Sequence, residues 1–252
     1  MQNSNKSIYK ILNFKNMTIL RDELKSSLLP LYKELLSGNT FDNVCTFCVQ
    51  WGKNFPDKKN TGILFIGKAV NGWINDETDV NVLFGDSSKK IFDICDQMEW
   101  VYNLEGNNDG YNTNKSSFWR VIKRISQKFY QNEEWYSYIA WSNLCKIAPF
   151  KGGNPNDMLY NEQLSSCQKI LAKEIEIFSP KFVVMLTSGW ENDFLYYLNG
   201  NIHTKSEEKL NWDDYQTKLY KIKDTIYIAS QHPQGKNEKK HIDVITNLIN
   251  KY

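Results

Sequence analysis

Short apolar runs recur along this chain, and each has the length of a buried β-strand. GILFIG (62–67), KFVVMLT (181–187) and TIYIAS (225–230) are rich in apolar and β-branched residues and end at small or polar residues. A fourth run lies within YSYIAWSNLCKI and predicts a strand at 137–145. The pattern of apolar positions therefore predicts four strands.

Longer amphipathic stretches separate these runs. Apolar residues recur at helical spacing in 17–36, 116–130, 160–178 and about 238–251, and a further helix is expected from Ser188. Strands that alternate with helices are typical of a parallel sheet with helices on both faces. The predicted fold class is therefore α/β, a three-layer α/β/α domain around a central, mainly parallel sheet of four strands.

The domain organisation follows from the same pattern. No stretch rich in Pro, Gly or Ser stands out as a linker, so we predict a single domain over residues 1–252. Residues of about 1–40 form an N-terminal helical extension in this interpretation. The aromatic-rich stretch at about 96–135 forms an insertion.

Composition adds limits on location and partners. Hydrophobic residues make up 41% of the chain and the net charge is only +2, so any binding of nucleic acid must come from a local basic patch. The apolar stretches are too short to span a bilayer, and the first residues lack the apolar core of a signal peptide. We therefore expect a cytoplasmic protein without a membrane partner. Five cysteines, an odd number, argue against a disulfide framework.

Candidate chemistry gathers where the predicted strands end. In an open parallel sheet, ligands bind beyond the carboxyl ends of the strands. Those ends carry GKAVNGW (67–73), NLCK (143–146), TSGW (187–190) and SQHP (230–233). Three of these four segments hold polar groups suited to a site, and the His-Pro pair fixes an extended turn.

Four segments in this order resemble motifs of the uracil-DNA glycosylase superfamily, and most closely those of its bacterial iron–sulfur type. They are ILFIGKAVNG (63–72), VLFGDSSKKIFDIC (82–95), SNLCKIAPFKGGNPND (142–157) and SQHPQ (230–234). The resemblance spans roughly residues 41–245. It implies the uracil-DNA glycosylase-like form of the three-layer fold, DNA as the partner, and a monomer.

The resemblance also implies roles for particular residues. It places His232 where the leaving base is stabilised, Asn143 where the pyrimidine edge is read, and Phe84 where a ring stacks on the base. Relatives carry an acidic or amide residue one or two positions after the first glycine, whereas this chain has Lys68 and Ala69 there. The polar group for water activation is therefore expected slightly further along. The expected site residues are catalytic His232, Asn71 and Asp76 (with Asp79 as an alternative), substrate-binding Gly67, Lys68, Phe84 and Asn143, and DNA-binding Gln234, Gly235, Lys236, Lys239 and Lys240.

The chemistry of these residue types suits cleavage of an N-glycosidic bond. The leaving base gains negative charge, which a histidine donor stabilises, and an asparagine amide offers both a donor and an acceptor to a pyrimidine edge. A flat ring can stack on a base that has left the duplex, and lysines can meet phosphates. Each residue also has a structural interpretation, namely a turn histidine, a buried amide, a core ring and a solvated start of a helix.

No cofactor is expected. The resemblance to the iron–sulfur branch offers one alternative, a [4Fe–4S] cluster held by Cys45, Cys48, Cys145 and Cys167. Cys145 lies two residues after Asn143, however, where relatives have a spacing of four. Free cysteines also commonly act as small buried hydrophobic residues.

Two classes of function follow. The first is a monofunctional DNA glycosylase that hydrolyses the N-glycosidic bond of a flipped-out base. That base is uracil or another modified pyrimidine, and we favour the latter. The enzyme's role would be DNA repair or antiviral defence against phages with modified DNA. The second is a catalytically inactive nucleic-acid-binding protein with the same fold, which Lys68 favours. A hydrolase of small nucleosides or nucleotides is a third option.

Overall fold

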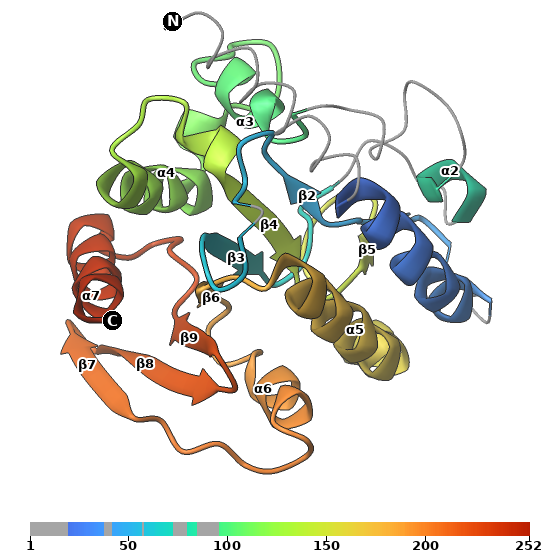
Figure 1. The fold of residues 1–252 in the computed structure, drawn as a ribbon. Coiled ribbons are helices and arrows are strands. Elements are labelled where there is room, and N and C mark those ends of the chain that lie inside the picture. The colour runs from blue at the N-terminus through green and yellow to red at the C-terminus, as the bar shows by residue number, and fades with distance from the viewer. Residues whose placement is uncertain (1–19, 38–41, 57, 73–79, 85–95) are drawn as a thin grey trace, which may run out of the picture.

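The computed structural model describes residues 20–37, 42–56, 58–72, 80–84 and 96–252. Its main sheet has seven strands in the order β2-β4-β3-β6-β9-β8-β7 (Figure 1). A separate two-stranded sheet pairs β1 with β5 in antiparallel fashion. The strands are β1 (Val44–Thr46), β2 (Gln50–Trp51), β3 (Ile63–Gly67), β4 (Ile139–Asn143), β5 (Ile147–Pro149), β6 (Phe182–Leu186), β7 (Glu208–Trp212), β8 (Tyr215–Ile222) and β9 (Thr225–Ser230).

The four predicted strands form the parallel centre of the main sheet. β4, β3, β6 and β9 lie side by side and pair in parallel, which confirms the fold class. The main sheet has more strands than the four predicted. β2 adds an antiparallel strand at one edge, and β8 and β7 add two at the other. β7 and β8 alternate between half-buried, exposed and buried positions, so they lack the continuous apolar run that marks the central strands.

Helices cover both faces of this sheet (Figure 1). α4 and α7 lie on one face, and α5, α6 and the helix at residues 20–36 lie on the other. After this N-terminal helix, the helices of the described residues are α2 (Val80–Phe84), α3 (Glu99–Asn103), η2 (Thr113–Lys115), α4 (Ser117–Tyr130), η3 (Trp135–Tyr138), α5 (Asp157–Phe178), α6 (Asn192–Leu198) and α7 (Glu238–Lys251).

Alternate residues of each central strand enter two separate hydrophobic cores. Leu64 and Ile66 of β3 pack in the core that holds α5 and α6, whereas Ile63 and Phe65 pack in the core that holds α4 and α7. Successive strand side chains point to opposite faces, so a strand between two helical layers must be apolar at every position. This explains why the central strands read as continuous apolar runs in the sequence.

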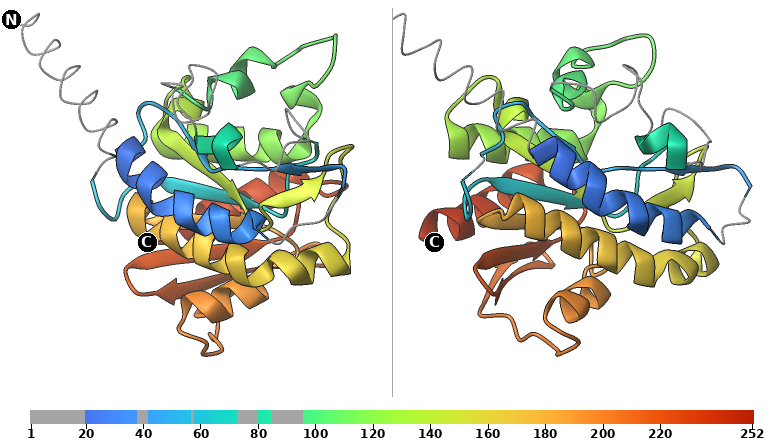
Figure 2. Two further views of the ribbon diagram at one scale, coloured as in Figure 1. Left: turned by 90° about the vertical axis from the view of Figure 1, so that its right-hand side faces the viewer. Right: turned by 45° about the vertical axis from the view of Figure 1, so that its right-hand side comes forward.

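The N-terminal helix belongs to the first of these cores. Leu24, Leu28 and Tyr32 are fully buried in the same cluster as residues of α5, and Figure 2 shows the helix at residues 20–36 lying beside α5. None of the helices within the described residues has the length and apolar character that crossing a membrane requires.

Capping side chains set where the two helices nearest the site begin. The Ser116 side chain accepts a hydrogen bond from the Trp119 N–H at the start of α4, and the Asn237 side chain accepts one from the Lys240 N–H at the start of α7. Such caps pair N–H groups that the first turn of a helix leaves free. The first turn of α4 lies beside the loop that links β9 to α7, where the ring centroids of Phe118 and His232 are 5.9 Å apart.

Candidate active site at the strand ends

The turns that follow β3 and β4 are joined to each other. Gly67 and Asn143 are register partners at the ends of the two parallel strands. Beyond them, the Leu144 N–H donates to the Gly67 carbonyl and the Cys145 N–H donates to the Lys68 carbonyl, each at 2.9 Å. The two turns therefore form one continuous floor at the carboxyl end of the sheet.

Asn143 is buried in this floor with its amide nitrogen unpaired. The residue is 1% exposed, and Nδ2 has no hydrogen-bond partner among the described residues. Its Oδ1 lies so close to Gly67 that a Cβ on that residue would fall 2.4 Å from it, which no side chain tolerates. An unpaired buried donor costs free energy, so Nδ2 is a donor for which the described residues supply no acceptor.

Phe118, in the first turn of α4, completes this corner of the site. Two atoms of its ring lie 3.3 and 3.4 Å from where a Gly67 Cβ would be. The same ring lies parallel to the imidazole of His232, with centroids 5.9 Å apart and planes at 11°. Phe118 therefore brings Gly67, Asn143 and His232 together in space. No motif marked this residue, because it lies in the stretch at 96–135 that reads as an insertion.

His232 is held as a neutral imidazole with its proton on Nε2. The Gln234 N–H donates to Nδ1 at 3.4 Å, so Nδ1 is the acceptor and this assigns the proton to the other nitrogen. Burial lowers the pKa of His232 to about 4, and the positive charges of Lys68 and Lys236 act in the same direction. A neutral imidazole with Nε2–H is a hydrogen-bond donor, as stabilisation of a developing anion requires.

Lys68 lies at the same edge of the sheet. Its ammonium group is 5.0 Å from the centre of the Trp190 ring, which favours a cation–π contact. Burial lowers the pKa of Lys68, Lys236 lowers it as well, and Glu191 acts in the opposite direction. A cation thus occupies the position after Gly67, where the resemblance led us to expect an acidic or amide group.

The turn after β6 is hydrogen-bonded to the backbone of His232. Ser188 adopts a left-handed backbone conformation with φ of 54°, and its Oγ accepts the His232 N–H at 2.7 Å. Glu191 closes the turn, because its carboxylate accepts the Gly189 N–H at 2.8 Å and the Thr187 hydroxyl. The strand-end rule pointed to this segment, but only the structure identifies Ser188 as the residue that holds the His232 backbone.

Two other expected residues, Phe84 and Asn71, are not part of this group. Phe84 is 5% exposed and packs against Tyr32 at 5.2 Å in the core on the α5 side, so it does not lie with Phe118 and His232. Asn71 is exposed and its Oδ1 accepts the Gly153 N–H at 2.8 Å, which ties two loops together. Asp76 lies outside the described residues, as does Asp79.

The expected DNA-binding residues lie directly after His232. Gln234 and Gly235 are exposed, and Gly235 has φ of 72° in the turn before α7. Lys236 lies 5.1 Å from the centre of the Tyr215 ring, and Lys239 is exposed. Lys240 forms an ion pair with Asp213, so its charge is partly neutralised. Among the described residues, Lys240 therefore has an ion-pair partner, whereas Lys236 and Lys239 form no ion pair.

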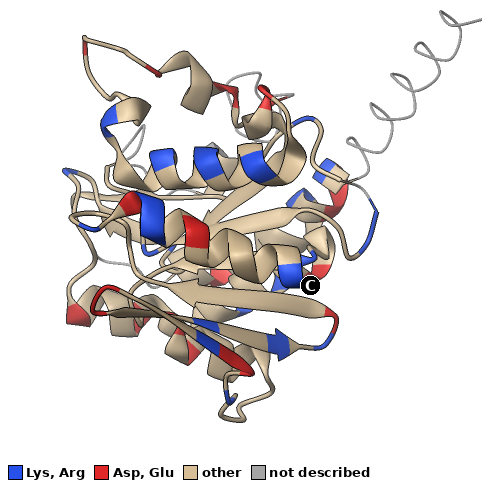
Figure 3. Cartoon of the chain, turned by 90° about the vertical axis from the view of Figure 1, so that its left-hand side faces the viewer, with Lys and Arg blue, Asp and Glu red and all other residues tan. Residues whose placement is uncertain are grey.

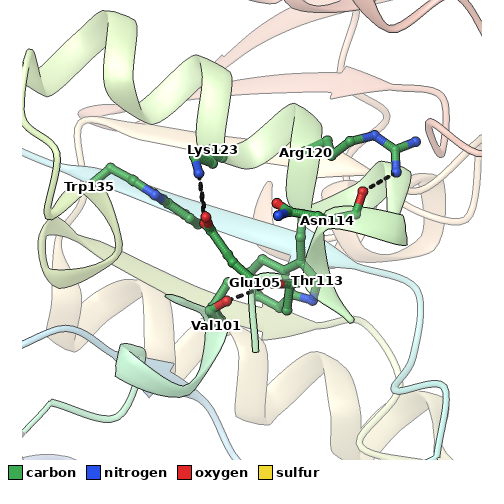
Figure 4. Close-up of a pocket in the computed structure, with 8 residues that line it drawn as sticks. Val101, Glu105, Thr113, Asn114, Arg120, Lys123 and Trp135 are labelled. Atoms are coloured by element: carbon green, nitrogen blue, oxygen red, sulfur yellow. Dashed lines mark hydrogen bonds and ion pairs between the residues drawn. The ribbon is translucent and has the colours of Figure 1, made fainter. Parts of the chain in front are cut away.

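Cations also line the groove between α4 and α7, which Figure 3 faces. Arg120 pairs with Glu238 and Lys128 pairs with Asp243 across this groove. A smaller hollow between α3 and α4 is crossed by the ion pair of Lys123 and Glu105 at 2.6 Å (Figure 4). The ion pairs neutralise much of the positive charge of α4, and the hollow leaves no room for a base.

The four cysteines do not form a cluster site. Cys45 donates its thiol hydrogen to the Ala148 carbonyl at 3.5 Å and belongs to the core on the α4 side, whereas Cys48 and Cys167 belong to the other core. Burial raises the pKa of both Cys48 and Cys167 to about 12, and it raises the pKa of Cys145 as well. Within the part of the chain that the structure describes, no three His, Cys, Asp or Glu side chains are arranged to hold a metal ion. These residues do not fit an iron–sulfur cluster.

Comparison with known proteins gives one result that bears on this site. The family model of the uracil DNA glycosylase superfamily matches residues 54–249. A search of curated proteins found no match. The matched span runs from the approach to β3 to the end of α7, so it contains all four strand ends and the whole floor around Asn143. The chain therefore belongs to the uracil DNA glycosylase superfamily.

Proposed function

We propose that this protein is a monofunctional DNA glycosylase that hydrolyses the N-glycosidic bond of a flipped-out pyrimidine, uracil or a modified one. Members of its superfamily are hydrolases that act on DNA. One observation carries the proposal. The buried Asn143 amide, whose nitrogen has no partner among the described residues, and the neutral imidazole of His232 both lie near the Phe118 ring.

The proposed roles follow from this geometry. Asn143 pairs with the edge of the base, and Phe118, rather than Phe84, provides the ring on which the base stacks. The bond between C1′ and the base nitrogen breaks with its electron pair leaving on the base. His232 Nε2–H donates to the base oxygen that gains this charge. Water then bonds to C1′ and its proton neutralises the base.

Lys68 contributes through His232 in this scheme. Burial is the main reason why the pKa of His232 is low, and the positive charge of Lys68 lowers it further, so the imidazole is a neutral donor at physiological pH. A lysine cannot act as the base for water at neutral pH unless its pKa falls far. The proposed mechanism therefore depends on stabilising the leaving base and not on an acidic residue directly after Gly67.

The test uses matched DNA duplexes that carry uracil, hypoxanthine, hydroxymethylcytosine or glucosylated cytosine at one position. Abasic sites are revealed by alkaline cleavage of the labelled strand. The proposal expects strand breaks from at least one pyrimidine duplex, and none from an unmodified duplex. Tight binding of a modified duplex without any abasic product would instead favour the second candidate, an inactive DNA-binding protein, which the cation at Lys68 supports.

A further inference from the structure

The turn after β4 contains a lysine whose ammonium group is completely buried. Lys146 and Glu174 both have side chains with 0% exposure. Lys146 Nζ donates to both carboxylate oxygens of Glu174 at 2.9 Å, to Ser142 Oγ at 2.6 Å and to the Asn143 carbonyl at 2.9 Å. Ser142 in turn donates its hydroxyl to Glu174 at 2.7 Å. The three protons of the ammonium group thus have partners on three residues.

An ion pair in such a position is expensive. Taking two charges out of water costs several kcal/mol per ion, and apolar residues of similar size are often at least as stable. Burial raises the pKa of Glu174, and the hydrogen bonds from Lys146 and Ser142 act against that rise. Stability alone is therefore a poor explanation for this pair, and its position suggests another.

The contacts of the pair converge on the end of β4. Lys146 holds the carbonyl of Asn143, and Ser142 is the residue before it. On the other side, Gly67 packs against the Asn143 side chain, as a Cβ there would fall 2.4 Å from Oδ1. Asn143 is thus held at its carbonyl from the interior and at its amide from the site, which fixes the direction of Nδ2.

Three of the four cysteines surround the same pair. Lys146 and Glu174 interact electrostatically with Cys48 and with Cys167, and Lys146 does so with Cys145. The Lys146 N–H also donates to Cys167 Sγ at 3.3 Å. The interior that a metal cluster would need therefore holds an ion pair and protonated thiols.

We propose that Lys146 and Glu174 form a positioning pair that aligns the Asn143 amide for base recognition, and that this chain has the pair in place of an iron–sulfur cluster. The inference rests on the proposed role of Asn143. Neither residue touches the base, so both act through Asn143. Their effect is on the rate of excision and on discrimination between bases, because a small misplacement of a positioned group costs about 100-fold in rate.

The test is the double variant Lys146→Met with Glu174→Leu, which replaces both charges with apolar side chains. We expect a melting temperature within a few degrees of the unchanged protein, an unchanged KM for DNA, and a kcat that falls about 10- to 100-fold. Selectivity between the preferred base and its nearest competitor should fall as well. Ser137→Ala is the matched control, because it removes a buried hydrogen bond to Asp96 near the opposite end of β4. It should leave kcat and selectivity unchanged.

A double-mutant cycle separates positioning from general damage. In the Asn143→Ala background, the substitutions at Lys146 and Glu174 should cause no further loss of kcat, since the residue through which they act is gone. Additive losses, or wild-type kcat and selectivity in the double variant, would overturn the proposal. Should the double variant fail to fold, Glu174→Gln keeps the size of the side chain and should lower kcat several-fold.

Two measurements do not depend on activity. The ¹⁵N-edited NMR signal of the Asn143 side-chain amide should shift in the double variant and stay in place in Ser137→Ala. Iron and sulfide in protein prepared without oxygen should stay well below one atom per chain, and about four of each would overturn the cluster part of the inference. Absence of excision from every duplex would defeat the proposed function, while the NMR signal would still decide whether the pair aligns Asn143.

Discussion

The turns after β3 and β4 are neighbours, and each carries a lysine, but the two lysines have opposite environments. Lys146, after β4, is fully buried and bonded to Glu174, Ser142 and Asn143. Lys68, after β3, is half-buried, lies over the Trp190 ring and has a lowered pKa. Lys146 is fixed by hydrogen bonds within the protein, whereas Lys68 is partly exposed to solvent.

This difference assigns the two lysines separate roles in the proposals above. A buried, fully bonded charge can hold a neighbouring residue in one orientation, whereas a half-buried charge changes the pKa of groups around it. In the proposals above, Lys146 orients Asn143, and Lys68 adds to the effect of burial on the pKa of His232. The predictions below test whether the two turns can be disturbed separately.

The largest effect is expected on stability at Lys146. Lys146→Met leaves Glu174 as a buried carboxylate without its partner, so the free energy of unfolding should fall by about 3–5 kcal/mol at pH 7. Lys68→Met removes only a cation–π contact and should cost at most about 1 kcal/mol. Urea denaturation of both variants measures the difference. Equal losses would show that the two lysines are not distinct in kind.

The next effect is expected on the rate of base excision at His232. His232→Ala should reduce base excision by a factor of about 100 to 1,000, because it removes one preorganised donor to the leaving base. Affinity for DNA should barely change, as measured by fluorescence anisotropy with a labelled duplex. His203→Ala is the control, because His203 is an exposed histidine between α6 and β7, and this variant should leave excision unchanged. A parallel loss of DNA binding in His232→Ala would give the histidine a structural role.

A smaller effect is expected on DNA affinity at the start of α7. Changing Lys236, Lys239 and Lys240 to serine should weaken binding and reduce the slope of log K against log salt by about 2, because each neutralised phosphate accounts for about 0.9 of that slope. The slope should fall by less than three full phosphates would give, since Lys240 already pairs with Asp213. Excision at saturating DNA should persist.

The control for that variant removes the same charge elsewhere. Lys181, Lys221 and Lys223 lie at the opposite end of the sheet from His232. Their replacement by serine should leave the salt dependence of binding unchanged. Similar losses of affinity in both triple variants would show that net charge, rather than the loop after His232, governs binding.

The smallest effect is a change in pH dependence at Lys68. His232 has a pKa of about 4 and is neutral above it, so excision should be insensitive to pH down to about 5 as far as this group is concerned. Lys68→Met removes a positive charge that lowers this pKa, so the pKa of His232 should rise and the acidic limb of the kcat profile should move to higher pH. NMR titration of the His232 ring gives the pKa directly. An unchanged pKa would place Lys68 outside the electrostatic reach of His232.

Much of the fold was predictable because the signals for it are local. The four central strands are continuous apolar runs, and their observed bounds lie within two residues of the predicted ones. β7 and β8 were missed because edge strands with one exposed face carry weaker patterns. The strand-end rule likewise predicted the neighbourhood of Gly67, Asn143 and His232, which depends only on strand direction.

The aromatic residue beside His232 was not predictable in this way. Phe84 lies in one of the motifs, whereas Phe118 lies in the stretch that reads as an insertion, and nothing in the order of residues says which ring turns toward His232. The choice depends on how α2 and α4 pack against the sheet, and this packing buries Phe84 against Tyr32 and places Phe118 beside Gly67.

By itself the sequence determined the three-layer fold and the edge of the sheet at which Asn143 and His232 lie. These properties follow from hydrophobic periodicity and turn residues, which act over a few positions of the chain. Only the tertiary structure decided that Phe118 joins them, that the cysteines lie in two different cores, and that Lys146 is neutralised by Glu174, 28 residues away. Those features depend on contacts between segments distant in sequence, where burial and charge are set jointly by several elements.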